Sequence, residues 1–254
     1  MVSRQREKEL ARARAERQAA RRAERAAARK RRNIQIAAVA AVALVVGAMT
    51  SLAMQRADRN PADEPTAAAS PGGCAYEDAE QAARKVPKPD PAKAREAANS
   101  TATVRTNRGD IVIELLAGQA PCTVNAIRHL AEQKYYDDTR CHRLVTSGIF
   151  VLQCGDPSGT GSGGPGFRFA DEALEGAEYP AGTVAMANAG PDTNGSQFFV
   201  VYQQGGLEAN YTPFGRVTRG LDLVEAIAAE GNAPDGTAPK RPVTIESFTV
   251  APAA

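Results

Sequence analysis

AMANAGPDTNGSQFFVVY, residues 185–202, is the stretch that decides how this chain folds. Two turn-forming dipeptides, Gly190-Pro191 and Asn194-Gly195, separate a short apolar segment from a run of aromatic and β-branched residues that is typical of a strand. Asn188 and Gln197 lie beside these turns, so their amides need hydrogen-bond partners if they are buried. We expect such a stretch to hold an extended peptide backbone rather than to attack it.

Two further blocks lie on either side of this stretch. The first is CHRLV at residues 141–145, followed after a short turn by FVLQCGD at residues 150–156, and the second is PFGRV at residues 213–217. Together the blocks resemble the signature of the cyclophilins, the cyclosporin-binding class of peptidyl-prolyl isomerases, in family order and close to family spacing. The resemblance covers residues 101–250.

Short strands and two helices are predicted for this region. Alternating apolar and polar residues predict a β-hairpin over residues 101–116, and apolar residues at helical spacing predict helices over Pro121–Gln133 and Leu221–Glu230. Further strands are expected at residues 140–146, 149–154, 183–187, 197–202, 212–218 and 243–250. This mainly β pattern indicates a barrel. The resemblance implies a closed eight-stranded antiparallel β-barrel capped by two helices.

The chain of 254 residues has a net charge of only +2, but its basic residues gather near the N-terminus. Residues 1–32 hold 13 Arg and Lys against 4 Glu, so the remainder is net acidic. We expect this basic tail to lie in the cytoplasm and to touch anionic lipid head groups. The alternative is nucleic-acid binding, which is not expected because the tail has no aromatic side chain to stack on bases.

Residues 33–54 follow the tail, and the part from Ile34 to Met54 contains no charged residue. A helix of this length rises roughly 30 Å, about the thickness of a bilayer's hydrocarbon core. We predict a single transmembrane signal anchor in a bacterial cell membrane, with everything after it outside the cytoplasm. The alternatives are a cleaved signal peptide, with a cleavage site at Ser51-Leu52-Ala53, and a buried helix of a soluble protein.

Residues 55–100 are rich in Pro and Ala and are predicted to be an extracytoplasmic linker that could include a short helix near Tyr76–Lys85. The isomerase-like domain is then expected over residues 101–252. All four cysteines follow the membrane segment, and an even number in an oxidising compartment favours disulfides. Because Cys141 and Cys154 flank a predicted hairpin, we prefer the pairs Cys141–Cys154 and Cys74–Cys122 over four buried free thiols.

Prolyl isomerisation breaks no covalent bond, and its barrier of about 18–20 kcal/mol comes from the amide resonance that is lost as the peptide bond twists. A catalyst must favour the twisted state, in which the prolyl nitrogen regains its lone pair. A guanidinium suits this task because it is always charged and only donates hydrogen bonds. The resemblance places Arg143 at the family's catalytic arginine position. The alternative is an arginine that forms a structural ion pair.

The resemblance also implies a set of substrate-binding residues. The apolar pocket for the proline ring is expected to contain Phe150, Val151, Phe199 and the nearby Leu207. Gln153 is expected to orient Arg143 or the substrate carbonyl, and Gln197 to close the far wall. The peptide main chain before the proline is expected on Ala187, Asn188 and Ala189, with Gly161 of a glycine-rich loop beside it.

This sequence departs from the usual family pattern at several positions. Two extra residues lie between Arg143 and Gln153, so the apolar pocket residues that follow them are placed across an insertion. Val151 stands where a Met is usual, and Tyr211 stands at the binding-site position where a His is usual. Gly206 stands where many members have a Trp that contacts cyclosporin. We therefore expect weak cyclosporin binding at most.

No cofactor and no metal are expected. Residues 159–164 match the GxGxxG dinucleotide fingerprint, but Pro165-Gly166 follows where a helix should begin, and no βαβ unit surrounds the match. His129 and His142 lack the neighbouring cysteines or carboxylates that a zinc site needs. We expect His142 to be a buried, hydrogen-bonded residue of its strand.

These features predict a membrane-anchored isomerase, by default a monomer, that acts on proline-containing polypeptides and assists the folding of exported proteins. The alternative is a non-catalytic module or holdase that binds proline-containing segments at the membrane. The residues at Gly206 and Tyr211 slightly favour this alternative, whereas the intact Arg143 opposes it.

Overall fold

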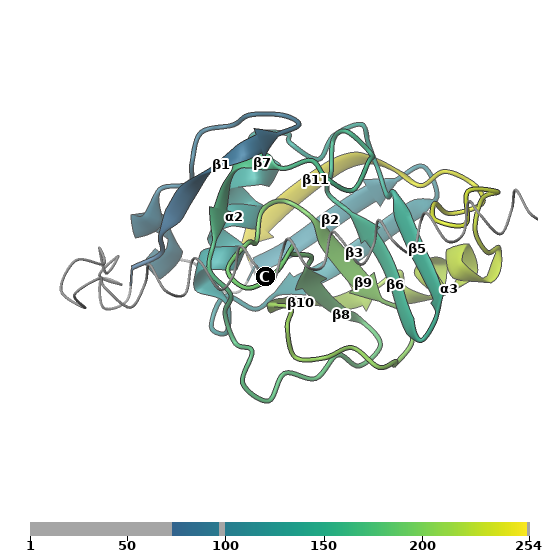
Figure 1. Ribbon diagram of the computed structural model, residues 1–254. Helices are drawn as coiled ribbons and strands as arrows, with labels where there is room; N and C mark the ends of the chain where they lie inside the picture. The colour runs from purple at the N-terminus through teal and green to yellow at the C-terminus, as the bar shows by residue number, and fades with distance from the viewer. Residues whose placement is uncertain (1–72, 97–99, 253–254) are drawn as a thin grey trace, which may run out of the picture. The chain divides into compact units, whose positions relative to one another are not determined.

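The structure is a computed structural model that describes residues 73–96 and 100–252. In these residues nine strands form one antiparallel sheet, in the order β4-β11-β2-β3-β10-β8-β9-β6-β5 (Figure 1). The strands are β2 (Ser100–Thr106), β3 (Gly109–Leu115), β4 (Thr139–Arg140), β5 (Arg143–Ser147), β6 (Ile149–Cys154), β8 (Thr183–Met186), β9 (Phe198–Val201), β10 (Pro213–Arg219) and β11 (Thr244–Pro252). The predicted hairpin is confirmed as β2 and β3.

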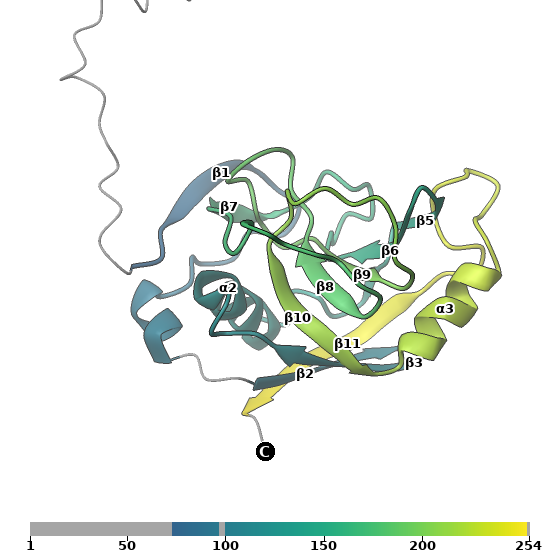
Figure 2. The same ribbon diagram turned by 90° about the horizontal axis from the view of Figure 1, so that it is seen from below.

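The sheet curls into a half-barrel that does not close, so the expected closed eight-stranded barrel is wrong (Figure 2). Its end strands, β4 and β5, share no ladder in the described part of the chain. The segment before β11 occupies the gap instead: the Leu144 N–H donates to the Thr237 carbonyl at 2.8 Å, and the Cys141 N–H donates to the Val243 carbonyl at 2.9 Å. Because this segment already satisfies backbone groups at the two edges, little drives them to pair.

Two helices lie at opposite ends of the curled sheet (Figure 2). α2 (Pro121–Glu132) begins with a proline, whose missing N–H costs nothing in the first turn, and it buries Val124, Ile127 and Leu130 completely. α3 (Leu221–Ala229) buries Val224 and Ile227. Both helices agree with the prediction to within a residue at their ends.

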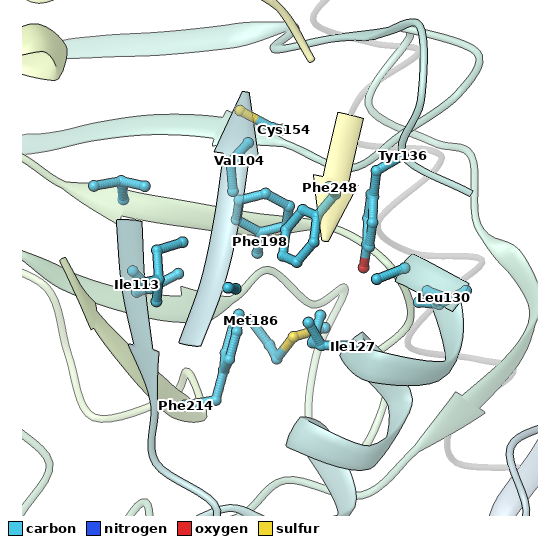
Figure 3. Packing of buried hydrophobic residues seen from close by; sticks show 14 of the residues in the cluster. Val104, Ile113, Ile127, Leu130, Tyr136, Cys154, Met186, Phe198, Phe214 and Phe248 are labelled. Atoms are coloured by element: carbon cyan, nitrogen blue, oxygen red, sulfur yellow. The ribbon is translucent and has the colours of Figure 1, made fainter. Parts of the chain in front are cut away.

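The main core lies between the curled sheet and α2 (Figure 3). Phe198 of β9 and Phe248 of β11 meet edge to face at 6.0 Å, and Tyr136 stacks against Phe248 at 4.8 Å. Each fully buried side chain of this size contributes about 1.5–3 kcal/mol. Since the core fixes one face of β9 and β6, it leaves the opposite face of these strands to carry the site.

Residues 76–82, where the sequence allowed a short helix, form strand β1 (Tyr76–Ala82) instead. β1 pairs with β7 (Pro165–Phe169) in a separate two-stranded sheet. Tyr76 packs edge to face against Phe167 and Phe169, and its hydroxyl donates to the Cys122 carbonyl at 2.8 Å. These tertiary contacts override the local helical propensity of an Ala- and Glu-rich segment.

Residues 73–96, which the sequence assigned to the linker, are therefore folded against the domain. A 3-10 helix, η1 (Pro91–Glu96), follows β1 and contacts α2. The disulfides are Cys74–Cys122 and Cys141–Cys154, so the preferred pairing is confirmed. No helix in the described residues is long and apolar enough to span a membrane, and the predicted anchor at 33–54 lies outside those residues.

Candidate functional site

The strand register places Arg143 among the residues predicted to act with it. Arg143 of β5 lies directly opposite Gln153 of β6, Gln153 lies opposite Phe199 of β9, and Phe199 lies opposite Ala185 of β8. Directly opposite residues of neighbouring strands point to the same face of a sheet. These four side chains therefore form one row across four strands, which we call the Arg143 row.

Two glutamine amides link Arg143 to the glycine-rich loop (residues 155–166). Arg143 Nη1 donates to Gln153 Oε1 at 3.2 Å, and Gln153 Nε2 donates to Gln197 Oε1 at 2.9 Å. Gln197 Nε2 then donates to the carbonyls of Gly161 and Gly163 at 3.0 and 2.9 Å. Because those carbonyls only accept, they fix the orientation of Gln197, and Gln197 in turn fixes Gln153. We call this chain of amides the glutamine relay.

Asp156 holds the glycine-rich loop in shape. Its fully buried carboxylate accepts hydrogen bonds from the backbone N–H groups of Ser158, Gly161 and Gly163 at 2.7–3.0 Å. Burial alone would raise the pKa of Asp156, but the Ser158 hydroxyl and these N–H groups outweigh burial and lower the pKa. A Cβ at Gly163 would lie 2.0 Å from Asp156 Oδ1, so this turn requires glycine.

An apolar cluster lies beside the Arg143 row and on the same face. Its buried members are Val151, Tyr179, Ala185, Phe199 and Val201, and its partly exposed members include Ile149, Ala187, Leu207 and Tyr211. Phe199 and Tyr211 meet edge to face at 5.3 Å. The Tyr179 hydroxyl donates to the Tyr211 carbonyl at 2.7 Å, and burial raises the pKa of Tyr179, which keeps this donor protonated. The cluster offers a partly exposed apolar seat on the site face.

Phe150, predicted for this seat, is on the other face of β6. Its ring packs against Tyr202 at 6.0 Å, on the side of the sheet that faces α3. Ile149 takes its place in the cluster, because Gln153, Val151 and Ile149 are spaced two residues apart along one strand. That alternation was available in the sequence and could have identified Ile149. Tyr179 lies in a loop and gave no such signal.

The remaining predicted residues border a groove of about 700 Å³ next to the Arg143 row. Its lining includes Gln153, Gln197, Gly161, Ala187, Asn188 and Ala189. The Asn188 amide donates to the Asn210 carbonyl at 2.8 Å and so ties two loops together. In the described part of the chain, the Asn188 backbone N–H and carbonyl have no hydrogen-bond partner, so they are free to pair with an extended peptide.

His142 differs from the expectation for it. Both ring nitrogens are buried, and neither has a hydrogen-bond partner in the described residues, although a hydrogen-bonded ring was predicted. The ring instead packs beneath Gly161 of the glycine-rich loop. Burial lowers the pKa of His142, the nearby Arg143 adds to this, and Asp156 opposes it.

Taken together, the site offers a guanidinium with free donors, an apolar seat and an unpaired stretch of backbone. None of these groups is an activated nucleophile. The arrangement can bind an extended peptide and polarise an atom near the seat without making a covalent bond.

Comparisons with known proteins agree with this geometry. The family model described as cyclophilin type peptidyl-prolyl cis-trans isomerase/CLD matches residues 101–250. The chain is 42% identical over 187 residues to the probable peptidyl-prolyl cis-trans isomerase B of Mycobacterium leprae, covering 67% of this chain and 63% of that protein. It is 46% identical over 158 residues to the Mycobacterium tuberculosis protein of the same description, covering 56% and 51%. The chain thus spans between about half and two thirds of the length of these relatives.

The solved structures point the same way. The crystal structure of a cyclophilin type isomerase of Cryptosporidium parvum, determined in the presence of the dipeptide Ala-Pro, superposes with a TM-score of 0.55 at 30% identity and covers 60% of this chain and 99% of that chain. The family match covers more than half of the chain and includes the whole Arg143 row, the glutamine relay and the apolar cluster. This chain belongs to the cyclophilin type peptidyl-prolyl cis-trans isomerase family.

Proposed function

We propose that the domain catalyses cis-trans isomerisation of X-Pro bonds in polypeptides. One observation carries the proposal: Gln153 of β6 accepts a hydrogen bond from the Arg143 guanidinium at 3.2 Å, and Phe199 of the apolar seat lies opposite Gln153 on the next strand, β9. A proline ring on that seat would bring its nitrogen toward the guanidinium. The proposal agrees with the names of the bacterial relatives and with the Ala-Pro dipeptide present with the Cryptosporidium relative.

The mechanism follows from what each group can do. The peptide main chain before the proline pairs with the Asn188 backbone, which holds one side of the rotating bond, while the apolar cluster holds the ring on the other side. As the bond twists, the prolyl nitrogen becomes pyramidal and gains a lone pair, to which Arg143 donates a hydrogen bond. That hydrogen bond exists only in the twisted state, so it lowers the barrier to rotation rather than merely tightening substrate binding.

The relay explains why Arg143 is ready to act. An exposed arginine samples many rotamers, and ordering it costs up to about 2 kcal/mol of side-chain entropy. Gln153 accepts from one of its five donors and leaves the others for the substrate. Through the relay, the glycine-rich loop orders the Arg143 side chain before the substrate binds, so less side-chain entropy is lost on binding.

We also propose that the domain acts outside the cytoplasm, anchored to a bacterial membrane through residues 33–54, and that it assists the folding of exported proteins. The basic tail and the uncharged segment that follows it support this placement. Two disulfides that engage all four cysteines support it as well, because such bonds persist in oxidising compartments. Weak cyclosporin binding at most remains part of the proposal, because Gly206 is exposed and offers no side chain to the drug. A monomer remains the default oligomeric state of the proposal.

The test is the cis-trans exchange rate of a short X-Pro peptide, measured by NMR with the full chain in detergent. We expect clear acceleration by the wild type and a loss of about 100-fold or more in kcat/KM for Arg143→Ala, with partial recovery in Arg143→Lys. Arg105→Ala, at an exposed arginine of β2, is the matched control and should retain activity. A folded wild-type protein that leaves the exchange rate unchanged would instead identify a non-catalytic module for proline-containing segments.

A further inference from the structure

One wall of the groove beside the Arg143 row comes from outside the family domain. The groove of about 700 Å³ runs from Gln153 and Gln197 past Ala187–Ala189, and its opposite wall consists of Asp78, Ala79 and Glu80 of β1. These three residues precede residues 101–250, which match the family model. The wall therefore lies outside the part of the site that the family model covers.

Several contacts fix this wall in place. The Cys74–Cys122 disulfide ties the start of β1 to the start of α2, and Tyr76 is buried against Phe167 and Phe169. The β1–β7 register shifts between Asp78 and Ala82, so the segment that contains Ala79 and Glu80 bulges from the ladder. Bulges turn side chains away from regular pairing and are common beside functional sites. The wall is thus an ordered part of the groove and not a passing contact.

The charged side chains of the lining are Asp78, Glu80 and Arg168. Arg168 donates to the Glu77 carboxylate at 3.0 and 3.2 Å. The positive charge of Arg168 is therefore paired with a carboxylate that does not line the groove. Lys88 forms an ion pair with Asp78 at 3.0 Å, but the Asp78 side chain is 81% exposed, and such a pair gives way easily to another cation. In the described residues Glu80 has no ion-pair partner. The wall therefore presents carboxylate charge to whatever lies in the groove.

We infer that β1 selects proline-containing substrates that carry Lys or Arg among the residues preceding the proline. The inference rests on the proposed function, which places the proline on the apolar cluster and the preceding main chain along Asn188. An extended peptide advances about 3.3 Å per residue, with alternate side chains on opposite sides, so a residue a few positions before the proline faces β1. A basic side chain there meets Glu80 and Asp78, whereas an acidic one is repelled.

The test compares peptides that differ only in one residue before the proline. Lys, Ala or Glu is placed in turn at each of the four preceding positions, and kcat/KM is measured with the full chain in detergent. At one of these positions we expect Lys to exceed Glu by about two- to fivefold, the range of an exposed charge interaction, and salt to reduce the ratio. Glu80→Gln should shrink the Lys/Glu ratio, the double variant Asp78→Asn with Glu80→Gln should remove it, and Glu80→Lys should reverse it.

Glu246→Gln is the matched control, because Glu246 is an exposed carboxylate of β11 that does not line the groove. It should leave the ratio unchanged. If the Ala peptides are isomerised but the Lys/Glu ratio is one at all four positions, the inference is overturned while the proposed function stands. If no peptide is isomerised, the proposed function fails. Binding of the same peptides, followed by NMR titration, then decides the inference separately: tighter binding of Lys than Glu supports it, and equal binding overturns it.

Discussion

Gln153 aims the guanidinium of Arg143, and this makes it the residue whose loss should reveal the relay. Gln153→Leu keeps the size of the side chain but removes both the acceptor for Arg143 and the donor to Gln197. A hydrogen bond to a charged group is worth about 1.5–3 kcal/mol, and part of that is regained by water at this half-exposed position. We expect kcat/KM to fall about tenfold, mainly through kcat, because Arg143 remains but is no longer held. The rate of cis-trans exchange, measured at several peptide concentrations, separates the effect on kcat from the effect on KM.

Gln119→Leu is the control for this change, since Gln119 is exposed and takes no part in the relay. The conservative variant Gln153→Glu should recover part of the activity, because a carboxylate can still accept from Arg143 even though it cannot donate to Gln197. Full activity in Gln153→Leu would show that Arg143 does not need Gln153 to hold its guanidinium in place.

His142 should make the stability of the domain depend on pH. Burial lowers the pKa of His142 in the folded protein below its usual value of 6.5, with a further contribution from Arg143. The unfolded chain therefore binds a proton more readily, and the free energy of unfolding should fall as the pH drops from about 7 through 6.5 toward the lower folded pKa. Below that pKa both states are protonated and the slope should vanish. Urea unfolding followed by circular dichroism at a series of pH values measures this.

His142→Gln should flatten that dependence, because glutamine does not titrate. Asp156 titrates in a separate window: its lowered pKa stabilises the fold above about pH 4, and that stability is lost at lower pH. An unchanged slope in His142→Gln between pH 7 and 5 would assign the effect to another group.

At this scale the structure brings together most of the residues that the sequence named for the site. Arg143, Gln153, Val151 and Phe199 could be placed because they sit in fixed positions on regular strands, and the strands were visible as alternating patterns. Phe150 was misplaced because it lies three residues before Gln153 on β6, an odd spacing that turns its side chain to the opposite face of the strand. Tyr179 could not be predicted in the same way, because it reaches the cluster from a loop through tertiary packing, which the sequence does not display.

Among the elements, β1 depends most on a single covalent link. The Cys74–Cys122 disulfide closes a loop of 48 residues, for which chain entropy predicts a stabilisation of about 4 kcal/mol. Replacing both cysteines by serine should lower the free energy of unfolding by about 2–4 kcal/mol, the range usual for native disulfides. Because β1 pairs only with β7 in the described residues, its amide protection should fall before that of β2 and β3. Hydrogen exchange detected by NMR or mass spectrometry measures the amide protection of β1 separately from that of β2 and β3.

The second disulfide supplies the matched control. Cys141→Ser with Cys154→Ser should also reduce stability, but it should leave β1 protection relative to β2 unchanged, since that bond joins the β4–β6 region. Equal loss of β1 protection in both double variants would mean that β1 is held by packing alone.

The elements that the sequence missed share one cause. Hairpins and amphipathic helices leave a periodic pattern within a short stretch of sequence, so β2, β3, α2 and α3 were all predicted. β1 and β7 are stable only because they pair with each other across 91 residues of chain, as in Glu77 with Arg168. The half-barrel likewise stays open because the segment that carries Thr237 takes the edge of β5. Neither pairing leaves a periodic pattern in the sequence.

At the scale of the whole molecule, the two disulfides support the proposal of an oxidising compartment. All four cysteines are bonded, and one of the two bonds holds the β1 wall against the groove. A reducing cytosol would keep such thiols free and would loosen that wall. The basic tail and the uncharged segment at 34–54 support the proposed placement on the oxidising side by an independent argument, based on charge asymmetry and length.

This convergence predicts a measurable state of the cysteines in cells. In a bacterial host, the wild-type chain should resist labelling by a membrane-permeant maleimide until it is denatured and reduced, after which four thiols should react. Leu44→Arg with Val46→Arg places two charges at the centre of the apolar segment, each of which opposes insertion by about 2.5–3.5 kcal/mol. That variant should remain in the cytosol with thiols that label at once, and it should leave the membrane fraction. Free thiols in the wild type would contradict the extracytoplasmic placement, whereas an oxidised, soluble and shortened wild type would show that residues 33–54 act as a cleaved signal.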